Sequence, residues 1–311
     1  MTMDVLAEVL SIGQLGSKVV CQPSLAKPWG LDFSTTQKSM LHFILGGICW
    51  IKPTKSTPAI RLMKGDIVFL TNNTWHGLTS DQDLDTVNYL DFDFQQNSLK
   101  QNVNSSDITR IFCASYNLDG DMAQPFFTLL PKFIHITADE IQNNPQLDRL
   151  LQLILSENSV DNIGHSTATS RLIDVLLIYV IRHWIGSHDT ETQSWLTALQ
   201  DPKLGPAIEL IHKHPGQKWD VEKLSKTVFM SRSAFSKRFT ESTGSSPGIY
   251  VVRWRMDLAA KLLRETHKSI QAIANEVGYE SETSFSKTFK KYRDLSPVQY
   301  RKIQSQRVVS Y

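Results

Sequence analysis

Two short stretches of the sequence place lysine and hydroxyl side chains at the same spacing. SAFSKRF runs from Ser233 to Phe239, and TSFSKTF runs from Thr283 to Phe289, fifty positions later. On a helix, which turns about 100° per residue, Ser233 and Lys237 lie opposite the phenylalanines of their stretch, and the second copy repeats this geometry. Such side chains donate hydrogen bonds to base edges and to phosphates. The repeat therefore predicts two copies of a polar, cationic surface suited to a nucleic acid.

Each copy is preceded by a shorter segment that is also predicted to be helical. VEKLSKTV begins at Val221 and IQAIANEV begins at Ile270, and both place apolar side chains at helical spacing. Ser231 and Ser281 stand directly before the repeated stretches, where a serine caps a helix well. A short helix, a tight turn and a capped second helix form a helix-turn-helix unit, whose second helix enters the major groove of DNA. A long amphipathic helix that starts at Pro247 is predicted to join the two units.

Charge is distributed unevenly along the 311 residues. Residues 1–200 contain 13 Lys and Arg against 20 Asp and Glu, whereas residues 201–311 contain 20 against 11. A basic segment of this size is typical of a domain that binds polyanions, although a lysine-rich solvated surface would give the same balance. The length predicts about two domains, and 41% hydrophobic residues are enough for both to fold.

Residues 202–302 resemble the DNA-binding domain of the AraC/XylS family of bacterial transcription regulators. The resemblance rests on Trp219 followed by Leu224, and on MSRSAFSKRF, GSSPGIY, R-x-x-x-A-x-x-L-L, I-x-x-I-A-x-x-V-G-Y-x-S, FSKTF and L-S-P-x-x-Y-R. Two positions depart from the family, which has an aromatic residue and then glycine where Arg293 and Asp294 stand. Because aspartate adopts the left-handed conformation less readily than glycine, the last helix is expected to dock slightly differently.

The resemblance implies double-stranded DNA and RNA polymerase as partners. The two units would address consecutive major grooves, about 34 Å apart, on one side of the duplex. Expected base contacts are Arg232, Ser233 and Lys237 in the first unit and Glu282, Thr283 and Lys287 in the second. Expected phosphate contacts are Arg238, Lys290 and Lys291. Lysine can donate to guanine, threonine can pack on a thymine methyl group, and glutamate can accept from cytosine. The four phenylalanines of the repeat and Trp219 are expected in the core.

The N-terminal part is predicted to form short strands separated by turns. SMLHFIL is apolar on both faces, as in a barrel wall that is covered outside, and YLDFDF alternates with Leu90, Phe92 and Phe94 predicted inward. PWGLDF, LHFILGGICWI and LMKGDIVFLTNNTWHGL resemble the cupin-like sensor domains of one AraC-type branch. The expected fold class is therefore an α+β multidomain protein with an N-terminal cupin-like β-barrel, a helical element and a C-terminal all-α domain with two helix-turn-helix motifs.

Histidines of this cupin-like part raise the question of a metal. Residues 65–76 fit the second cupin motif in spacing, but Thr71 replaces its usual proline and no His-x-His pair stands upstream. A catalytic metal site needs about three protein ligands, so His42 and His76 are too few, and neither a metal nor another cofactor is expected. His42, Trp75 and His76 are candidates to bind a small effector at the barrel mouth. Alternatively, His76 is a structural residue at a strand end.

Two helical patterns follow the barrel. PQLDRLLQLIL starts at Pro145 and aligns Leu147, Leu150, Leu151 and Ile154 on its predicted inner face. SRLIDVLLIYVIRHWI aligns Leu172, Val175, Leu176 and Tyr179 in the same way, with Trp184 near its end. They could cover the barrel, or form a homodimer as a similar pair does in relatives. The expected domains are 1–140 for the sensor, 141–200 for the helical element and linker, and 201–311 for the DNA-binding domain.

The three cysteines, Cys21, Cys49 and Cys113, are an odd number in a chain whose start, with Asp4 and Glu8, does not resemble an export signal. A disulfide framework is therefore not expected, no apolar run is long enough to cross a membrane, and a cytoplasmic location is expected. Some cupin-bearing relatives sense oxidants through thiols. Cys21, in a segment expected to be exposed, is the redox candidate.

These observations predict a DNA-binding transcription regulator, an activator rather than an enzyme, that responds to a small effector or an oxidant. The alternative is a metal-dependent cupin enzyme with an accessory DNA-binding domain. A third reading is a nucleoid-type protein that binds DNA without sequence preference.

Overall fold

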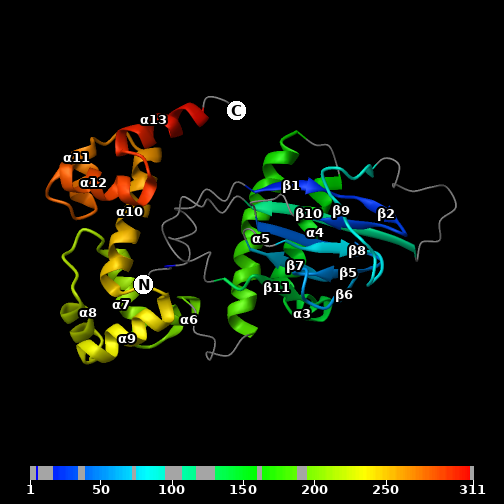
Figure 1. Ribbon diagram of the computed structural model, residues 1–311, viewed down its shortest axis with the longest axis horizontal. Helices are drawn as coiled ribbons and strands as arrows, with labels where there is room; N and C mark the ends of the chain where they lie inside the picture. The colour runs from blue at the N-terminus through cyan, green and yellow to red at the C-terminus, as the bar shows by residue number, and fades with distance from the viewer. Residues whose placement is uncertain are drawn as a thin grey trace. The chain divides into compact units, whose positions relative to one another are not determined.

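The computed structural model describes residue 5 and residues 17–33, 39–71, 75–94, 107–116, 130–159, 163–187 and 195–308. The chain divides into two compact units. The first unit comprises residues 15–118 and 130–188, and it contains the strands and helices α3 to α5 (Figure 1). The second unit is centred on residues 189–311 and contains helices α6 to α13.

The first unit contains two β-sheets. In one sheet the strand order is β1-β10-β4-β7-β11, with β2 also paired to β10, and in the other it is β6-β5-β8-β3-β9. The strands are β1 (Lys18–Cys21), β2 (Ser24–Ala26), β3 (Gly30–Asp32), β4 (Ser39–Gly46), β5 (Ile48–Lys52), β6 (Ile60–Met63), β7 (Ile67–Leu70), β8 (Gly77–Thr79), β9 (Val87–Asn88), β10 (Ile108–Tyr116) and β11 (Phe133–Ile136). Residues from both sheets share one core that includes Leu31, Ile44, Cys49, Leu78 and Cys113. The sheets therefore face each other, as expected for a cupin-like barrel.

Strand β4 is buried on both faces from Ser39 to Ile44, as its sequence predicts for a wall covered outside. Helices α3 (Ala138–Gln142), α4 (Pro145–Ser159) and α5 (His165–Ser187) belong to the same unit. Tyr116 of β10 donates a 2.9 Å hydrogen bond to the carbonyl oxygen of Ile173, which fixes α5 to the sheet. The predicted inner face of α4 is confirmed, since Leu147, Leu150, Leu151 and Ile154 are all buried.

Two expectations for this unit are wrong. YLDFDF is not a strand, because β9 ends at Asn88 and Asn88 then accepts hydrogen bonds from the N–H groups of Leu90 and Asp91, which closes a turn and leaves Leu90 66% exposed. Phe92 and Phe94 are half-buried and pack against the barrel core, so their predicted inward position is confirmed. On α5 the buried face is rotated from the predicted one. Its buried residues are Thr169, Ile173, Leu176, Leu177, Val180, Ile181 and Trp184. Of the predicted set, Leu172, Val175 and Tyr179 lie instead at the edge of this face or outside it.

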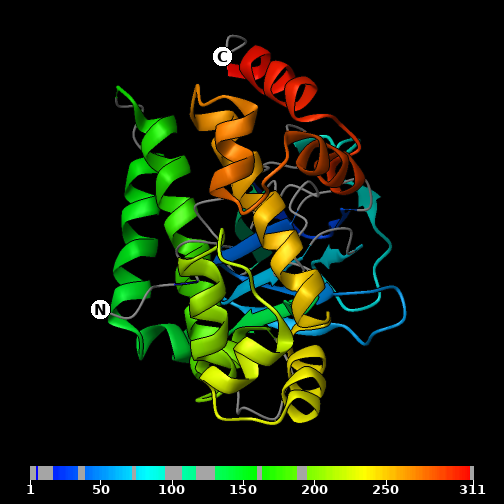
Figure 2. The ribbon, with the colours of Figure 1, turned by 90° about the vertical axis from the view of Figure 1, so that its left-hand side faces the viewer.

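The second unit is helical. Its helices are α6 (Trp195–Gln200), α7 (Leu204–Lys213), α8 (Val221–Thr227), α9 (Arg232–Thr243), α10 (Pro247–Glu265), α11 (Ile270–Glu276), α12 (Glu282–Arg293) and α13 (Pro297–Val308). Figure 1 and Figure 2 show α10 joining a group that contains α7, α8 and α9 to a group that contains α11, α12 and α13. The pairs α8/α9 and α11/α12 are the two predicted helix-turn-helix units. Ser231 and Ser281 cap α9 and α12 by accepting N–H bonds from Ala234 and Ser284, as predicted.

The sequence repeat extends beyond the two recognition helices. Phe235 and Phe239 are fully buried, and Phe239 meets Tyr250 edge to face at 5.3 Å between ring centroids. Fifty residues later Phe285 and Phe289 are fully buried, and Phe289 meets Tyr300 edge to face at 5.5 Å. Both tyrosines follow a Ser-Pro pair, and each donates its N–H to the serine carbonyl at 2.9 Å. The same aromatic cluster therefore anchors both recognition helices.

Trp219, expected in the core, is only half-buried, and the ammonium group of Lys223 lies 5.0 Å from its ring.

The C-terminal ends of the recognition helices are also equivalent. Gly244 ends α9 with φ 69°, and Asp294 ends α12 with φ 57°, each donating its N–H to the carbonyl four residues earlier. Asp294 thus takes the left-handed conformation for which the family uses glycine, a conformation that aspartate tolerates better than most residues.

Arg293, the other departure from the family, is buried at the end of α12. Its guanidinium forms an ion pair with Asp257 of α10, and both side chains are almost fully buried. A cation at this position would be costly without a partner, because a buried charge loses its hydration. Asp257 on α10 therefore compensates for the replacement of the family's aromatic residue, and the pair fastens α12 to the connecting helix.

The connecting helix also ties the two halves together through Arg255. Its guanidinium donates to the carbonyl oxygens of Pro215 at 2.8 Å and Gln217 at 2.9 Å, in the loop before α8, and to that of Gly278 at 3.4 Å, in the turn between α11 and α12. One planar donor thus joins backbone from both helix-turn-helix groups. Burial lowers the pKa of Arg255 from its usual value, but guanidinium remains charged at any physiological pH.

Asp257→Leu should destabilise the helical unit by about 3–5 kcal/mol, because it leaves the Arg293 charge buried without its partner. The double variant Asp257→Leu, Arg293→Met should recover most of this loss, since it removes both charges. Urea unfolding of the full-length chain, followed in the helical transition, measures both effects. Equal losses in the single and double variants would contradict a compensated pair.

Candidate functional site

The first recognition helix, α9, presents its predicted contact residues to solvent. Arg232, Ser233 and Lys237 are all exposed. Two of them have carboxylate neighbours: Arg232 lies 3.6 Å from Glu222 of α8, and Lys237 lies 3.9 Å from Glu241 one turn along α9. Exposed pairs of this kind are weak, contributing about 0–1 kcal/mol, so a phosphate or a base edge competes for these cations at little cost.

The second recognition helix, α12, has the same arrangement. Glu282, Thr283 and Lys287 are exposed, while Phe285 and Phe289 of the same helix are buried. The N–H of Glu282 is bonded to the side chain of Gln271 at 3.2 Å, which fastens the start of α12 to α11. The six residues expected to contact bases therefore lie on two equivalent solvent-facing surfaces.

The three residues expected to bind phosphates differ among themselves. Lys290 and Lys291 are exposed near the end of α12. Arg238 is half-exposed and forms an ion pair with Asp201, which lies in the loop between α6 and α7. Burial alone would raise the pKa of Asp201, but hydrogen bonds from the N–H groups of Leu204 and Lys203 and the contact with Arg238 lower it. Asp201 is therefore a negatively charged group held beside α9. The sequence did not predict its contact with Arg238, because the two residues are 37 positions apart.

In the first unit, the two histidines expected to meet an effector lie together in the core. His42 of β4 and His76 are both fully buried, and their Nε2 atoms are 2.8 Å apart. The ring of Phe33 stacks on His76 at 4.7 Å and tilts against His42 at 4.8 Å. On its other side, Nδ1 of His42 lies 3.2 Å from Sγ of Cys113 on β10.

Cys113 in turn has Cys21 as its neighbour. The two residues are cross-strand partners in the antiparallel pairing of β1 with β10. A hydrogen bond with Cys21 and burial raise the pKa of Cys113 well above its usual value. Burial also raises the pKa of Tyr89, and the two thiols add to this shift, which places the Tyr89 hydroxyl in the same cluster. The sequence singled out Cys21, but it could not show that Cys113 and His42 stand behind it.

The protonation states in this cluster follow from burial. Desolvation lowers the pKa of His42 well below its usual value, and His76 adds to this, so His42 is neutral at physiological pH. Sγ of Cys113, the two ring nitrogens of His42 and Nε2 of His76 therefore form one continuous hydrogen-bonded chain.

Trp75, the third residue expected to bind an effector, directly precedes His76 in the chain. It is half-buried, and the ammonium group of Lys55 lies 5.5 Å from its ring.

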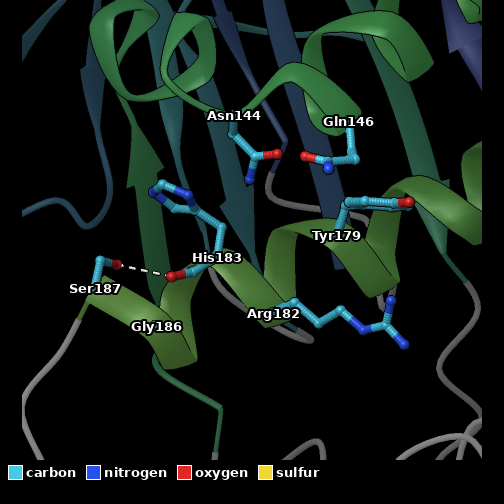
Figure 3. Close-up of a pocket in the computed structure, with 7 residues that line it drawn as sticks. All are labelled: Asn144, Gln146, Tyr179, Arg182, His183, Gly186 and Ser187. Atoms are coloured by element: carbon cyan, nitrogen blue, oxygen red, sulfur yellow. Dashed lines mark hydrogen bonds between the residues drawn. The ribbon is translucent and has the colours of Figure 1, made fainter.

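A cavity of about 420 Å³ occurs elsewhere in the unit, between the start of α4 and the last turns of α5 (Figure 3). It is lined by Asn144, Gln146, Tyr179, Arg182, His183, Gly186 and Ser187.

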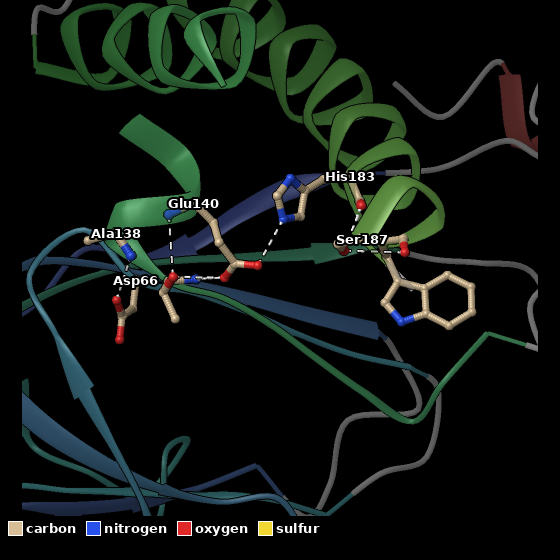
Figure 4. Close-up of polar contacts among 7 residues, drawn as sticks. Asp66, Ala138, Glu140, His183 and Ser187 are labelled. Atoms are coloured by element: carbon tan, nitrogen blue, oxygen red, sulfur yellow. Dashed lines mark hydrogen bonds and ion pairs between the residues drawn. The ribbon is translucent and has the colours of Figure 1, made fainter. Parts of the chain in front are cut away.

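A polar chain leads from this cavity to the barrel (Figure 4). His183 contacts Glu140 of α3 at 3.3 Å, and Glu140 accepts hydrogen bonds from the N–H and hydroxyl of Thr137. The next N–H, that of Ala138, donates to Asp66 at 2.9 Å. Burial alone would raise the pKa of Asp66, but His135 and the N–H groups of Met63 and Ala138 lower it by hydrogen bonding to the carboxylate.

The turn that holds Asp66 requires glycine at the preceding position. Gly65 has φ 98°, and a Cβ atom there would lie 2.8 Å from that of Ala138. The Gly-Asp pair of the cupin-like signature thus docks α3 on the barrel. Within the residues that the structure describes, no three His, Cys, Asp or Glu side chains are grouped so that they could hold a metal ion.

Comparison with known proteins gives matches in both units. Residues 4–186 match the family described as Cupin, and residues 224–303 match the family described as Helix-turn-helix domain. An uncharacterized HTH-type transcriptional regulator of Haemophilus influenzae is 31% identical over 96% of this chain and 99% of its own length. The HTH-type transcriptional regulator AlkR of Acinetobacter baylyi is 30% identical over 96% and 99%. The RCS-specific HTH-type transcriptional activator RclR of Escherichia coli is 25% identical over 96% and 97%.

Among the helices that the structure describes, none combines the length and the apolar composition needed to cross a bilayer.

The two kinds of lysine should respond differently to truncation. Lys237→Ala should weaken binding to a cognate duplex by about 1–3 kcal/mol and relax base preference in one half-site. Lys290→Ala should weaken binding to all duplexes alike and make the salt dependence shallower by about one ion. Affinity titrations at several salt concentrations, on cognate and scrambled duplexes, measure both. Identical behaviour of the two variants would contradict the division into base and phosphate contacts.

Proposed function

The chain belongs to the AraC-like transcriptional regulators with an N-terminal cupin domain, and we propose that it activates transcription from sites whose two halves are read by α9 and α12. One observation carries this proposal: two equivalent helices, each anchored by a buried Phe-Phe-Tyr cluster, turn lysine-bearing faces to solvent. A single chain with two such surfaces can read an asymmetric site along one side of a duplex.

Base contacts by the six exposed residues of α9 and α12 are part of this proposal. Arg238, Lys290 and Lys291 are assigned to phosphates, with Arg238 exchanging Asp201 for the DNA backbone. Domain boundaries at 1–140, 141–200 and 201–311, a homodimer, and contact with RNA polymerase remain proposals that rest on the family. A metal-dependent cupin enzyme stays the alternative, and stoichiometric metal together with turnover by the purified protein would support it.

For the signal, the geometry supports an oxidant better than a small ligand at His42, Trp75 and His76. The two histidines are fully buried against each other, whereas Cys21 is half-buried at a strand that pairs with β10. Directly paired residues on antiparallel strands have Cα atoms about 4.5–5.5 Å apart, which lies within the range that a disulfide spans. Cys21 and Cys113 pair next to a register shift in this ladder and their thiols are hydrogen-bonded, so the two sulfur atoms are close enough to be candidates for a disulfide.

The proposed chemistry takes two steps. A two-electron oxidant of the peroxide or hypochlorite class oxidises the Cys21 thiol to a sulfenic acid and is itself reduced to an alcohol, water or chloride. The sulfur of Cys113 then attacks the Cys21 sulfur, the S–S bond forms and the hydroxyl group leaves. Nδ1 of His42 receives the Cys113 proton, which goes on to the hydroxide and forms water. Nδ1 of His42 lies 3.2 Å from Sγ of Cys113, within reach of this proton.

An oxidised sensor affects the DNA-binding unit only if the two states of the chain differ in affinity for DNA. Oxidation then shifts the population toward the state in which the disulfide is more stable. Linking β1 to β10 removes the freedom of β1, whose neighbour α5 is tied to it by hydrogen bonds between Ser17 and Ser170. Helix α5 is the last described element before α6, so it is the element best placed to pass the change on.

Mild oxidation of the full-length chain should link Cys21 to Cys113 and change its transcription output. Cys21→Ser should abolish both effects, and Cys113→Ser should leave a sulfenic acid on Cys21 that a dimedone probe traps. Cys49→Ser is the matched control, because burial raises the pKa of Cys49 to about 12 and the thiol stays protonated. Peptide mass spectrometry and in vitro transcription measure the outcome. A Cys21→Ser protein that still responds would contradict thiol sensing.

A further inference from the structure

The turn before the first recognition helix carries an exposed aromatic residue in a strained conformation. Phe229 lies between α8 and α9 with 90% of its surface exposed, and its φ is 54°. A bulky side chain at positive φ is a genuine outlier, because its Cβ crowds the backbone. Strain of this kind is found mainly where a function maintains it.

The second helix-turn-helix unit provides an internal comparison. Gly278 stands at the equivalent position with φ 84°, and both turns are closed by the same pair of hydrogen bonds. Phe229 donates to Lys226 and Gly278 donates to Asn275, at 3.2 and 3.1 Å. A Cβ at Gly278 would lie 2.7 Å from the carbonyl oxygen of Gly216, so packing requires glycine there. Phe229 has the same positive-φ backbone conformation, but burial of its ring does not compensate for the strain.

The surroundings of Phe229 are cationic. Nζ of Lys203 lies 6.0 Å from the centre of its ring. Lys226, at the end of α8, and Arg232, at the start of α9, share one carboxylate, that of Glu222, at 2.8 and 3.6 Å. An apolar ring beside Lys203, in a turn whose flanking helices carry Lys226 and Arg232, suits an apolar group carried by a polyanion. A hydrophobic protein surface that bound here would have to desolvate these cations, so binding of such a partner is disfavoured.

DNA provides such a group beside this turn. In a helix-turn-helix unit the N-terminal residues of the recognition helix contact base edges, and the preceding helix crosses the backbone. Phe229 stands two residues before the cap, Ser231, and therefore adjoins the groove when α9 enters it. The 5-methyl group of thymine is the apolar feature of the major groove.

We propose that Phe229 contacts a thymine methyl group at the edge of the first half-site. The first half-site thereby gains a thymine preference that the second half-site, facing Gly278, lacks. This inference rests on the proposed function, because it assigns a specificity residue to the same DNA-binding surface.

The test uses the full-length chain and a duplex that the wild type selects from a random library. Phe229→Asn keeps a residue that tolerates positive φ, and Phe229→Gly copies Gly278. Val298→Asn, at a residue 64% exposed on α13, is the matched control for loss of an exposed apolar side chain. In parallel, deoxyuridine replaces each thymine of the first half-site in turn, which removes only the methyl group.

Phe229→Asn and Phe229→Gly should bind the selected duplex about fivefold to tenfold more weakly, the lower part of the range of a lost base contact. Their unfolding temperature should not fall, because both residues relieve the strain at this position. One deoxyuridine substitution should weaken the wild type by a similar factor and leave both variants unaffected. Val298→Asn should bind as the wild type does.

Unchanged affinity of Phe229→Asn for the selected duplex would overturn the inference. Unchanged affinity combined with lost activation in reconstituted transcription would overturn it in favour of a protein partner. If the wild type itself enriches no sequence, the proposed function fails. If it enriches a site on which the Phe229 variants bind normally, only this inference fails.

Discussion

A buried aromatic cluster, present twice, is the constraint on which the DNA-binding unit depends. Phe235, Phe239 and Tyr250 are fully buried, so α9 cannot rotate about its axis without exposing large apolar surfaces. The copy around Tyr300 imposes the same orientation on α12. Since the inward face of each helix is fixed, its outward face is fixed too. Arg255 then links the two halves through backbone carbonyls, so their surfaces are held in one arrangement.

The sequence predicted the features that depend on neighbours along the chain. Helix periodicity, serine caps and the inward phenylalanines all arise from residues within about four positions of each other, and the structure confirms them. The same local reasoning failed where a tertiary contact decided the outcome. YLDFDF alternates like a strand, yet Asn88 turns the chain, and α5 buries the face set by the sheet beneath it rather than the one predicted.

The contacts that the sequence could not reveal join residues far apart in the chain. Cys21 meets Cys113 only because β1 pairs with β10, and His42 reaches the same sulfur only because β4 lies on the other side of β10. The sequence identified Arg293 only as a departure from the family, because its partner Asp257 lies 36 positions away in the chain. Each of these contacts involves a buried or half-buried polar group, which shows how the fold satisfies groups that would otherwise be costly to bury.

We propose that one chain presents two equivalent reading surfaces to one side of a duplex. Methylation interference at guanine N7, on a duplex selected by the full-length protein, tests it most directly because N7 lies in the major groove. Two blocks of interfering guanines are expected, centred about one helical turn, or 10–10.5 base pairs, apart. A single block, or no block at all, would contradict it.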